Sequence, residues 1–399
     1  MSEFKCEVVK AVIEPHPNAD AIEICRIGDF QSIVKKGQVK TGDLCVYIPE
    51  QAVLPEWLLK DMGFWDDFAV KGELHGGAGN RVKAQKIRGV VSQGLILTMK
   101  GMNYGYGATV TRPPIENDGF LTDSDGVVPM IFEVGDDVAE FLGITKYEPA
   151  LPSQMRGKIV GVDFEATHGY DFDNLKNRTS LFDDGDIVVI TEKIHGTLLQ
   201  IGIMPASHSN EKFYDGRIII TSKGMGKNGF ILDHNDETNL YAQACKRHGL
   251  LEKAQMLYGE ADAHERPIFI FGEVFGKTMS GANVQDLTYT DEMLDYRCFD
   301  ICIGNRGNET FYNWNRFFGT CLMLDIPTVP VLHIGPYSKE MVLSHTDGNT
   351  TMTSRNQIRE GVVVKSYSED RHPHYGRKIA KSVSNAYLLR KNPDATEFN

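Results

Sequence analysis

Residues 186–203 read DIVVITEKIHGTLLQIGI and contain the most informative pattern for the fold. Runs rich in Val, Ile, Leu and Thr predict two strands, at 186–192 and 197–203. Lys193 ends the first run, and Gly196 allows a tight turn before the second. The turn therefore presents an amine to a pocket, and such an amine is a nucleophile where burial or neighbouring cations favour its uncharged form. Taken alone, a hairpin with an exposed lysine is the alternative.

Further short motifs follow in order, all but the last within or beside an expected strand. They are TSKG at 221–224, IFGE at 270–273, CFDI at 298–301, EGVVVK at 360–365 and KIAK at 378–381. Strands are expected at 217–222, 268–274, 296–303 and 361–367, and helices at 238–258 and 315–324. Because strands and helices do not alternate regularly, an α+β fold is favoured over a doubly wound parallel sheet.

The part of the chain before Pro149 has a different sequence pattern. Short β-rich segments, such as 22–27, 31–34 and 44–48, are separated by Gly and Pro at close spacing. This spacing is typical of a small barrel or sandwich. Pro149 and Pro152 bracket a natural boundary between this part and the second one.

The ordered motifs resemble those of the covalent nucleotidyltransferases, the superfamily of ATP-dependent DNA and RNA ligases and mRNA capping enzymes. Within it, EKIHGT at 192–197 resembles the nick-sealing RNA ligases. HPNADAIEI at 16–24, GDLCVYIPE at 42–50 and VSQGLIL at 91–97 resemble the OB domain of one RNA ligase branch. The resemblance implies an OB-fold β-barrel at 1–148. An adenylyltransferase (ligase) domain of antiparallel sheets with helices would follow at 149–399.

Domain order favours the same branch. DNA ligases and capping enzymes carry an OB domain after the last motif. Only 18 residues follow Lys381, too few for a barrel, so we expect an RNA ligase.

The resemblance also implies roles for the cations and the nucleophile. Lys193 would attack the α-phosphorus of ATP and form lysyl-AMP, and His195 would serve the later steps. Lys365, Lys378 and Lys381 would surround the phosphates, where positive charge offsets charge developing at phosphorus.

Nucleotide and metal contacts are implied in the same way. Glu192 would accept a hydrogen bond from the adenine amino group and so select ATP over GTP. Glu273 would hold the ribose hydroxyls, and Phe299 would stack on adenine. Because side chains alternate along a strand, Asp300 would then lie on the opposite face from Phe299. Gly196 and Lys223 would lie beside the nucleotide, where Lys223 would act as a point charge. Glu360 would be the ligand of Mg²⁺ or Mn²⁺. One departure is Leu198, which stands where these relatives commonly have Asn.

Composition limits the other possibilities. The 399 residues carry a formal net charge of −12 and are 41% hydrophobic, which excludes a disordered or fibrous chain. The seven cysteines are an odd number spread thinly, which favours free thiols. We expect a cytoplasmic protein without a membrane partner, because we see no secretory signal and no apolar run of ~18 residues. A monomer is favoured, with the oligomeric state left open.

Charge distribution favours a nucleic-acid partner. Residues 351–399 hold four Lys and five Arg against five acidic residues, although the chain as a whole is acidic. We therefore expect an ATP-dependent RNA ligase that acts on RNA or an RNA-containing nicked duplex, in nick or RNA repair. The alternatives are a non-catalytic RNA-binding OB protein, a DNA ligase and a capping guanylyltransferase.

Overall fold

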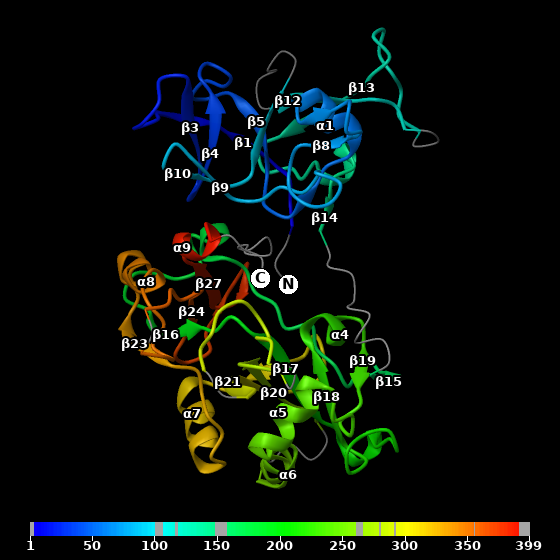
Figure 1. The fold of residues 1–399 in the computed structure, drawn as a ribbon, viewed down its shortest axis with the longest axis vertical. Coiled ribbons are helices and arrows are strands. Elements are labelled where there is room, and N and C mark those ends of the chain that lie inside the picture. The colour runs from blue at the N-terminus through cyan, green and yellow to red at the C-terminus, as the bar shows by residue number, and fades with distance from the viewer. Residues whose placement is uncertain are drawn as a thin grey trace. The chain divides into compact units, whose positions relative to one another are not determined.

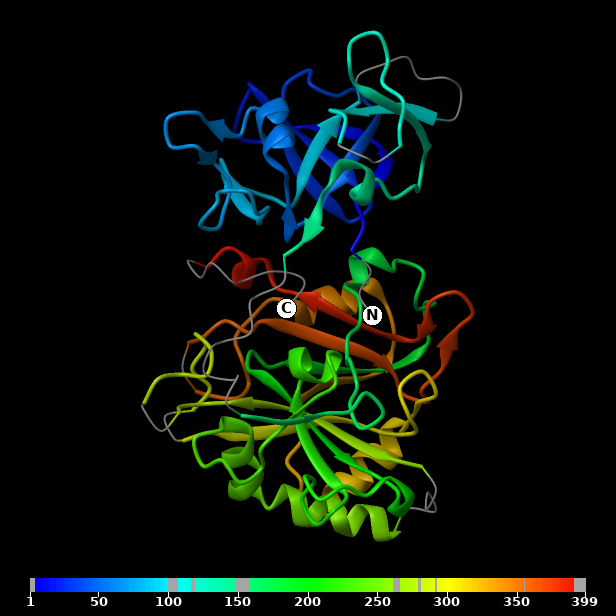
Figure 2. The same ribbon diagram turned by 90° about the vertical axis from the view of Figure 1, so that its right-hand side faces the viewer.

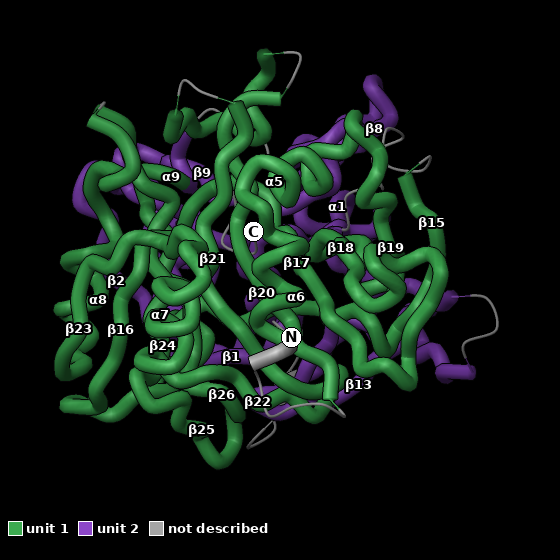
Figure 3. The backbone as a smooth tube through the Cα atoms, turned by 90° about the horizontal axis from the view of Figure 1, so that it is seen from below, with its two compact units in different colours: residues 1, 150–387 green, residues 2–149, 388–399 purple. Residues whose placement is uncertain are grey.

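The computed structural model describes residues 4–99, 107–115, 119–147, 158–260, 266–278, 281–290, 293–354 and 356–390. It divides into two compact units, one of residues 2–149 with 388–399 and one of residues 1 and 150–387 (Figure 3). The predicted boundary between residues 148 and 149 lies outside the described residues. Within those ranges, no helix is long and apolar enough to cross a membrane. All seven cysteines are buried free thiols, as expected.

The first unit consists mainly of short antiparallel strands. Strand β5 (Leu44–Ile48) lies at its centre: Cys45 and Tyr47 pack into one apolar cluster and Val46 and Ile48 into another. Alternating side chains therefore bury both faces of this strand. Its neighbours are β1 (Glu7–Lys10) and β11 (Leu95–Thr98), and a second sheet has the order β2 (Val12–Pro15), β3 (Ile22–Ile27), β4 (Phe30–Lys35). The three predicted strands are confirmed as β3, β4 and β5.

Strand pairs and two short helices complete this unit. They are β6 (Ala52–Val53) with β14 (Thr145–Lys146), β7 (Trp65–Asp66) with β8 (Lys71–Gly72), β9 (Gln85–Ile87) with β10 (Val90–Ser92), β12 (Gly107–Arg112) with β13 (Val128–Glu133), and helices α1 (Glu56–Met62) and α2 (Ala139–Leu142).

The second unit is built on two antiparallel sheets that form layers (Figure 2). The seven-stranded sheet has the order β15 (Ile159–Val162), β19 (Phe230–Leu232), β18 (Ile218–Ser222), β17 (Thr197–Ile203), β20 (Ile268–Phe275), β21 (Asp295–Ile303), β22 (Thr310–Phe311). The four-stranded sheet has the order β23 (Val331–Pro336), β16 (Ile187–Lys193), β24 (Gly361–Ser366), β27 (Ile379–Val383). A separate hairpin joins β25 (Arg371–His372) to β26 (Gly376–Arg377).

Helices cover the outer face of the seven-stranded sheet (Figures 1 and 2). The main ones are α5 (Leu240–His248), α6 (Leu250–Glu260) and α7 (Trp314–Met323). The helix predicted at 238–258 is two helices, because Gly249 at φ 58° ends α5 in the left-handed conformation. The shorter elements are η1 (Leu175–Asn177), η2 (Ala206–His208), α4 (Lys223–Lys227), α8 (Lys339–Thr346) and α9 (Asn385–Leu388).

The turn at 193–197 joins the two sheets. Strand β16 pairs with β23 and β24, whereas β17 pairs with β18 and β20. The two strands are therefore not a hairpin, and the alternative interpretation of this stretch is wrong. The chain crosses from one layer to the other at the predicted nucleophile.

Candidate active site

Lys193 ends β16 beside a buried carboxylate. Its Nζ lies 2.6 Å from Oε1 of Glu360, the residue immediately before β24. The Lys193 side chain keeps 18% of its surface exposed, and that of Glu360 is fully buried. Burial raises the pKa of Glu360, but the charges of Lys193 and His195 and the hydrogen bond from Lys193 lower it further, to about 2. The lysine amine therefore faces a permanent negative charge.

Gly196 brings a second carboxylate to the turn. Its backbone N–H donates to Oε1 of Glu273 at 3.1 Å. A Cβ at this position would lie 2.3 Å from the Val274 carbonyl oxygen and 2.9 Å from Cγ of Glu273, so the approach requires glycine. Burial raises the pKa of Glu273 to about 7, against the opposing charge of Lys193. Glu273 therefore gains and loses its proton near neutral pH.

Two further lysines lie near Lys193. Lys381 on β27 is only 3% exposed, and burial together with the charges of Lys223 and Lys193 lowers its pKa to about 7. Lys223, the first residue of α4, places its Nζ 3.1 Å from Oδ1 of Asp171. Lys193 and Lys223 are both close enough to Lys381 for their charges to lower its pKa, so three lysines from different strands and helices lie in one region.

His195 contacts Glu360 and three residues that no motif had indicated. Its Nε2 lies 2.8 Å from Oδ1 of Asp286, and its Nδ1 lies 3.1 Å from Oη of Tyr387 and 3.5 Å from Oε2 of Glu360. Its backbone N–H donates to Oη of Tyr289 at 2.7 Å. Asp286, Tyr289 and Tyr387 come from parts of the sequence without a recognised pattern, so nothing there pointed to them.

Glu192 is held by a loop. Its carboxylate is buried and accepts hydrogen bonds from the Thr350 hydroxyl and from the N–H and hydroxyl of Thr351, the latter two at 2.8 Å. The three donors orient the carboxylate within the sheet. Its predicted contact with adenine stays a prediction.

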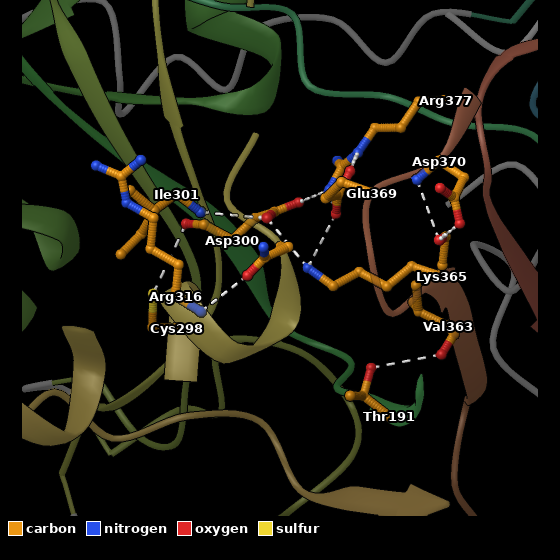
Figure 4. Close-up of polar contacts among 12 residues, drawn as sticks. Thr191, Cys298, Asp300, Ile301, Arg316, Val363, Lys365, Glu369, Asp370 and Arg377 are labelled. Carbon is orange, nitrogen blue, oxygen red and sulfur yellow. Dashed lines mark hydrogen bonds and ion pairs between the residues drawn. The ribbon is translucent and has the colours of Figure 1, made fainter. Parts of the chain in front are cut away.

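Lys365 belongs to a different buried cluster (Figure 4). Its Nζ lies 3.2 Å from Oδ1 of Asp300 and 3.5 Å from Oε1 of Glu369. Arg377 contacts the same two carboxylates, at 2.7 Å from Asp300 and 2.6 Å from Glu369. Tyr170 also donates its hydroxyl to Asp300, at 2.7 Å.

Phe299 and Asp300 are not on opposite faces of β21. The pairing with β20 passes from Cys298 directly to Asp300, so Phe299 is the extra residue of a β-bulge. Tyr170 contacts both side chains, with its ring 5.3 Å from that of Phe299. The simple alternation predicted for this strand is therefore wrong, because a bulge resets it.

The structure does not bring Lys365 and Lys378 to the nucleophile. Lys365 pairs in register with Val189, four residues before Lys193 and about 13 Å away along the strand. Lys378 places its Nζ 2.6 Å from Oδ2 of Asp186, beyond the opposite end of β16. Lys381, the third lysine predicted to surround the phosphates, is close enough to Lys193 for that charge to lower its pKa.

Comparison with known proteins gives a consistent result. An RNA ligase family model matches residues 186–383, and a model of an OB-fold domain matches residues 6–99. The comparison with curated proteins gives no match. Among solved structures, Naegleria gruberi RNA ligase with AMP and Mn is 23% identical, covers 97% of this chain and 98% of its own, and has a TM-score of 0.67. Forms of that protein with ATP and Mn and with PPi have the same identity and coverage and TM-scores of 0.68 and 0.67.

The structural likeness agrees with the fold, and the family model covers the turn at Lys193, the four-stranded sheet and all of the seven-stranded sheet except β15. Residues 186–383 therefore form a domain of the RNA ligase family of enzymes, and an OB-fold domain precedes it.

Proposed function

We propose that this protein is an ATP-dependent RNA ligase that joins 3′-hydroxyl and 5′-phosphate ends. The observation that carries the proposal is the Lys193 amine, which is partly exposed where the chain crosses between the two sheets. The family supports the type of reaction, and ATP or AMP with Mn in the solved Naegleria gruberi enzyme supports the nucleotide.

In the first step, Nζ of Lys193 attacks the α-phosphorus of ATP. A P–N bond forms, the bond to the bridging oxygen breaks, pyrophosphate leaves with that electron pair, and the amine loses its proton. AMP then passes to the 5′-phosphate of the RNA, and a 3′-hydroxyl displaces AMP to seal the strand. Lys223 and Lys381 offset the phosphate charge, which is the main contribution a protein makes to such a displacement.

The nucleotide contacts are proposed from the same arrangement. Glu192 has about four acceptor positions, and Thr350 and Thr351 use three of them, which leaves one for the adenine amino group. Glu273, held at Gly196, would accept from the ribose hydroxyls. Phe299, only partly buried, would stack on the base.

A divalent cation fits beside Glu360. Among the described side chains, Oε2 of Glu360 is a buried oxygen that no hydrogen bond satisfies, although His195 Nδ1 is 3.5 Å away. Carboxylate oxygen is a preferred ligand for Mg²⁺ and Mn²⁺. The bound cation would neutralise phosphate charge.

The decisive experiment uses ATP labelled on the α-phosphate with Mg²⁺ or Mn²⁺, followed by denaturation. We expect label on the wild-type chain and none on K193A. K378A is the matched control, because the Lys378 ammonium pairs with Asp186 at the far end of β16. This variant should be labelled like the wild type. An unlabelled wild-type chain would instead favour a non-catalytic RNA-binding protein.

The substrate is tested separately, with nicked duplexes that carry RNA or DNA on each side of the nick. Sealing that requires RNA on at least one side supports an RNA ligase. Equal sealing of all-DNA nicks would identify a DNA ligase, and preferential labelling by GTP a capping enzyme.

A further inference from the structure

The second ring nitrogen of His195 points to a carboxylate on another loop. Asp286 lies between β20 and β21 and places Oδ1 2.8 Å from Nε2 of His195. The histidine side chain is 8% exposed, whereas that of Asp286 is 34% exposed. The Asp286 carboxylate thus contacts a buried imidazole from the surface side.

This contact determines how the ring presents its other nitrogen. An ionised carboxylate only accepts hydrogen bonds, so Nε2 of His195 carries the proton that it shares with Asp286. Nδ1 then faces the Tyr387 hydroxyl at 3.1 Å and Oε2 of Glu360 at 3.5 Å. Because Glu360 also holds Lys193 at 2.6 Å, the orientation of the ring bears directly on the nucleophile and its carboxylate.

The loop that carries Asp286 is fixed at both ends. Val284 donates its N–H to the Gly276 carbonyl at 2.8 Å, and Gly276 has a φ of 97° that favours glycine. On the other side, the Thr288 N–H donates to Oε1 of Gln357 at 2.9 Å. The carboxylate is therefore held in place before any substrate binds.

We propose that Asp286 is a positioning residue for ligation, which acts by fixing the orientation of the His195 ring against Glu360. The proposal rests on the ligase function proposed above. Its physical basis is that a hydrogen-bond partner fixes the tautomer and orientation of a histidine ring; for histidines that bind metals, removing such a partner lowers activity by about ten- to a hundredfold.

The test compares D286A, H195A and the double variant in two assays, formation of lysyl-AMP and sealing of a nick. We expect D286A to lower the same step as H195A by at least tenfold, and the double variant to be no slower than H195A. D286N keeps an acceptor oxygen and the side-chain volume, and should recover most of the activity. Because Asp286 is partly exposed, D286A and D286N should unfold at the wild-type temperature.

A matched control is Asp163, whose Oδ2 lies 2.7 Å from Nε2 of His208 in a pair beyond the other end of β17. D163A should leave both steps unchanged. Wild-type rates in D286A or in H195A would overturn the proposal, as would losses that multiply in the double variant. Absence of label on the wild-type chain would instead overturn the ligase function itself, so the two failures are distinguishable.

Discussion

Asp300 should be essential for stability, and D300N tests this. The side chain is fully buried and lies 3.2 Å from Lys365 and 2.7 Å from Arg377. Glu369 is the second carboxylate of the cluster, so two cations balance two anions (Figure 4). D300N keeps the side-chain shape but removes one anion, which leaves an uncompensated positive charge inside the protein.

The magnitude follows from that charge. Removing one partner of a buried ion pair costs about 3–5 kcal/mol, because the remaining ion has lost its water and its counter-charge. With a urea dependence of about 2–3 kcal/mol per molar, the unfolding midpoint should fall by about 1–2.5 M. The replaced pair is buried, so added salt should change this difference little.

The assay follows urea unfolding by the fluorescence of Trp314, whose ring lies 5.8 Å from Nζ of Lys365. A background of W57F and W65F leaves Trp314 as the single tryptophan and confines the signal to the unit that carries the cluster. D325N is the control: its side chain is fully exposed and 3.7 Å from Lys253, and such pairs contribute less than about 1 kcal/mol.

The pH dependence gives a second readout. Burial raises the pKa of Asp300, but Arg377 and Lys365 lower it further, to below its ordinary value. A depressed pKa contributes stability that is present above the unfolded-state value of about 3.9 and is lost as the pH falls through the folded-state value. D300N should lack this acid-dependent loss. A difference from wild type below about 1 kcal/mol at pH 7 would refute the reasoning.

Three other changes test the site. G196A should abolish labelling by ATP without unfolding the protein, because its methyl group would lie 2.3 Å from the Val274 carbonyl oxygen and displace Glu273; normal labelling would contradict this. E273Q should raise the melting temperature at pH 8 more than at pH 5, because an acid with a pKa raised to about 7 loses its stabilising contribution as the pH rises. Equal increases at the two pH values would exclude burial as the cause of the raised pKa. K378M should retain the labelling rate and lose a little stability, because the ion pair of Lys378 with Asp186 is removed. A labelling rate lowered tenfold would show that Lys378 contributes to the site.

Sequence alone predicted the strands and the turn well, because each of these residues sits at a position that local chemistry specifies. Lys193 and Gly196 lie where an apolar run ends, and Glu273 and Glu360 lie within or just before other runs. Antiparallel pairing of those runs then brings the residues together. The correct prediction of the strands therefore also predicted which of these residues lie close together.

Other parts depend on contacts between distant segments. Asp286 and Tyr387 are 91 and 192 residues from His195, and neither lies in a pattern that marks a function. The bulge at Phe299 leaves no mark in an otherwise alternating strand. Lys365 shares its motif with Glu360, and only the structure shows that the two residues serve different clusters.

Strand β24 explains why one motif serves both clusters. Glu360 precedes the strand and Lys365 lies five residues further on, and the strand holds them apart at a fixed distance while pairing with β16 on one side and β27 on the other. Gly361 permits this close packing, since a Cβ there would lie 2.1 Å from the Ser382 carbonyl oxygen. The ion pairs of Lys365 with Asp300 and Glu369 tie β24 to the neighbouring sheet and to its own following loop. The buried cluster therefore fixes the strand that sets Glu360 against Lys193, so residues outside the contact between these two side chains still determine its geometry.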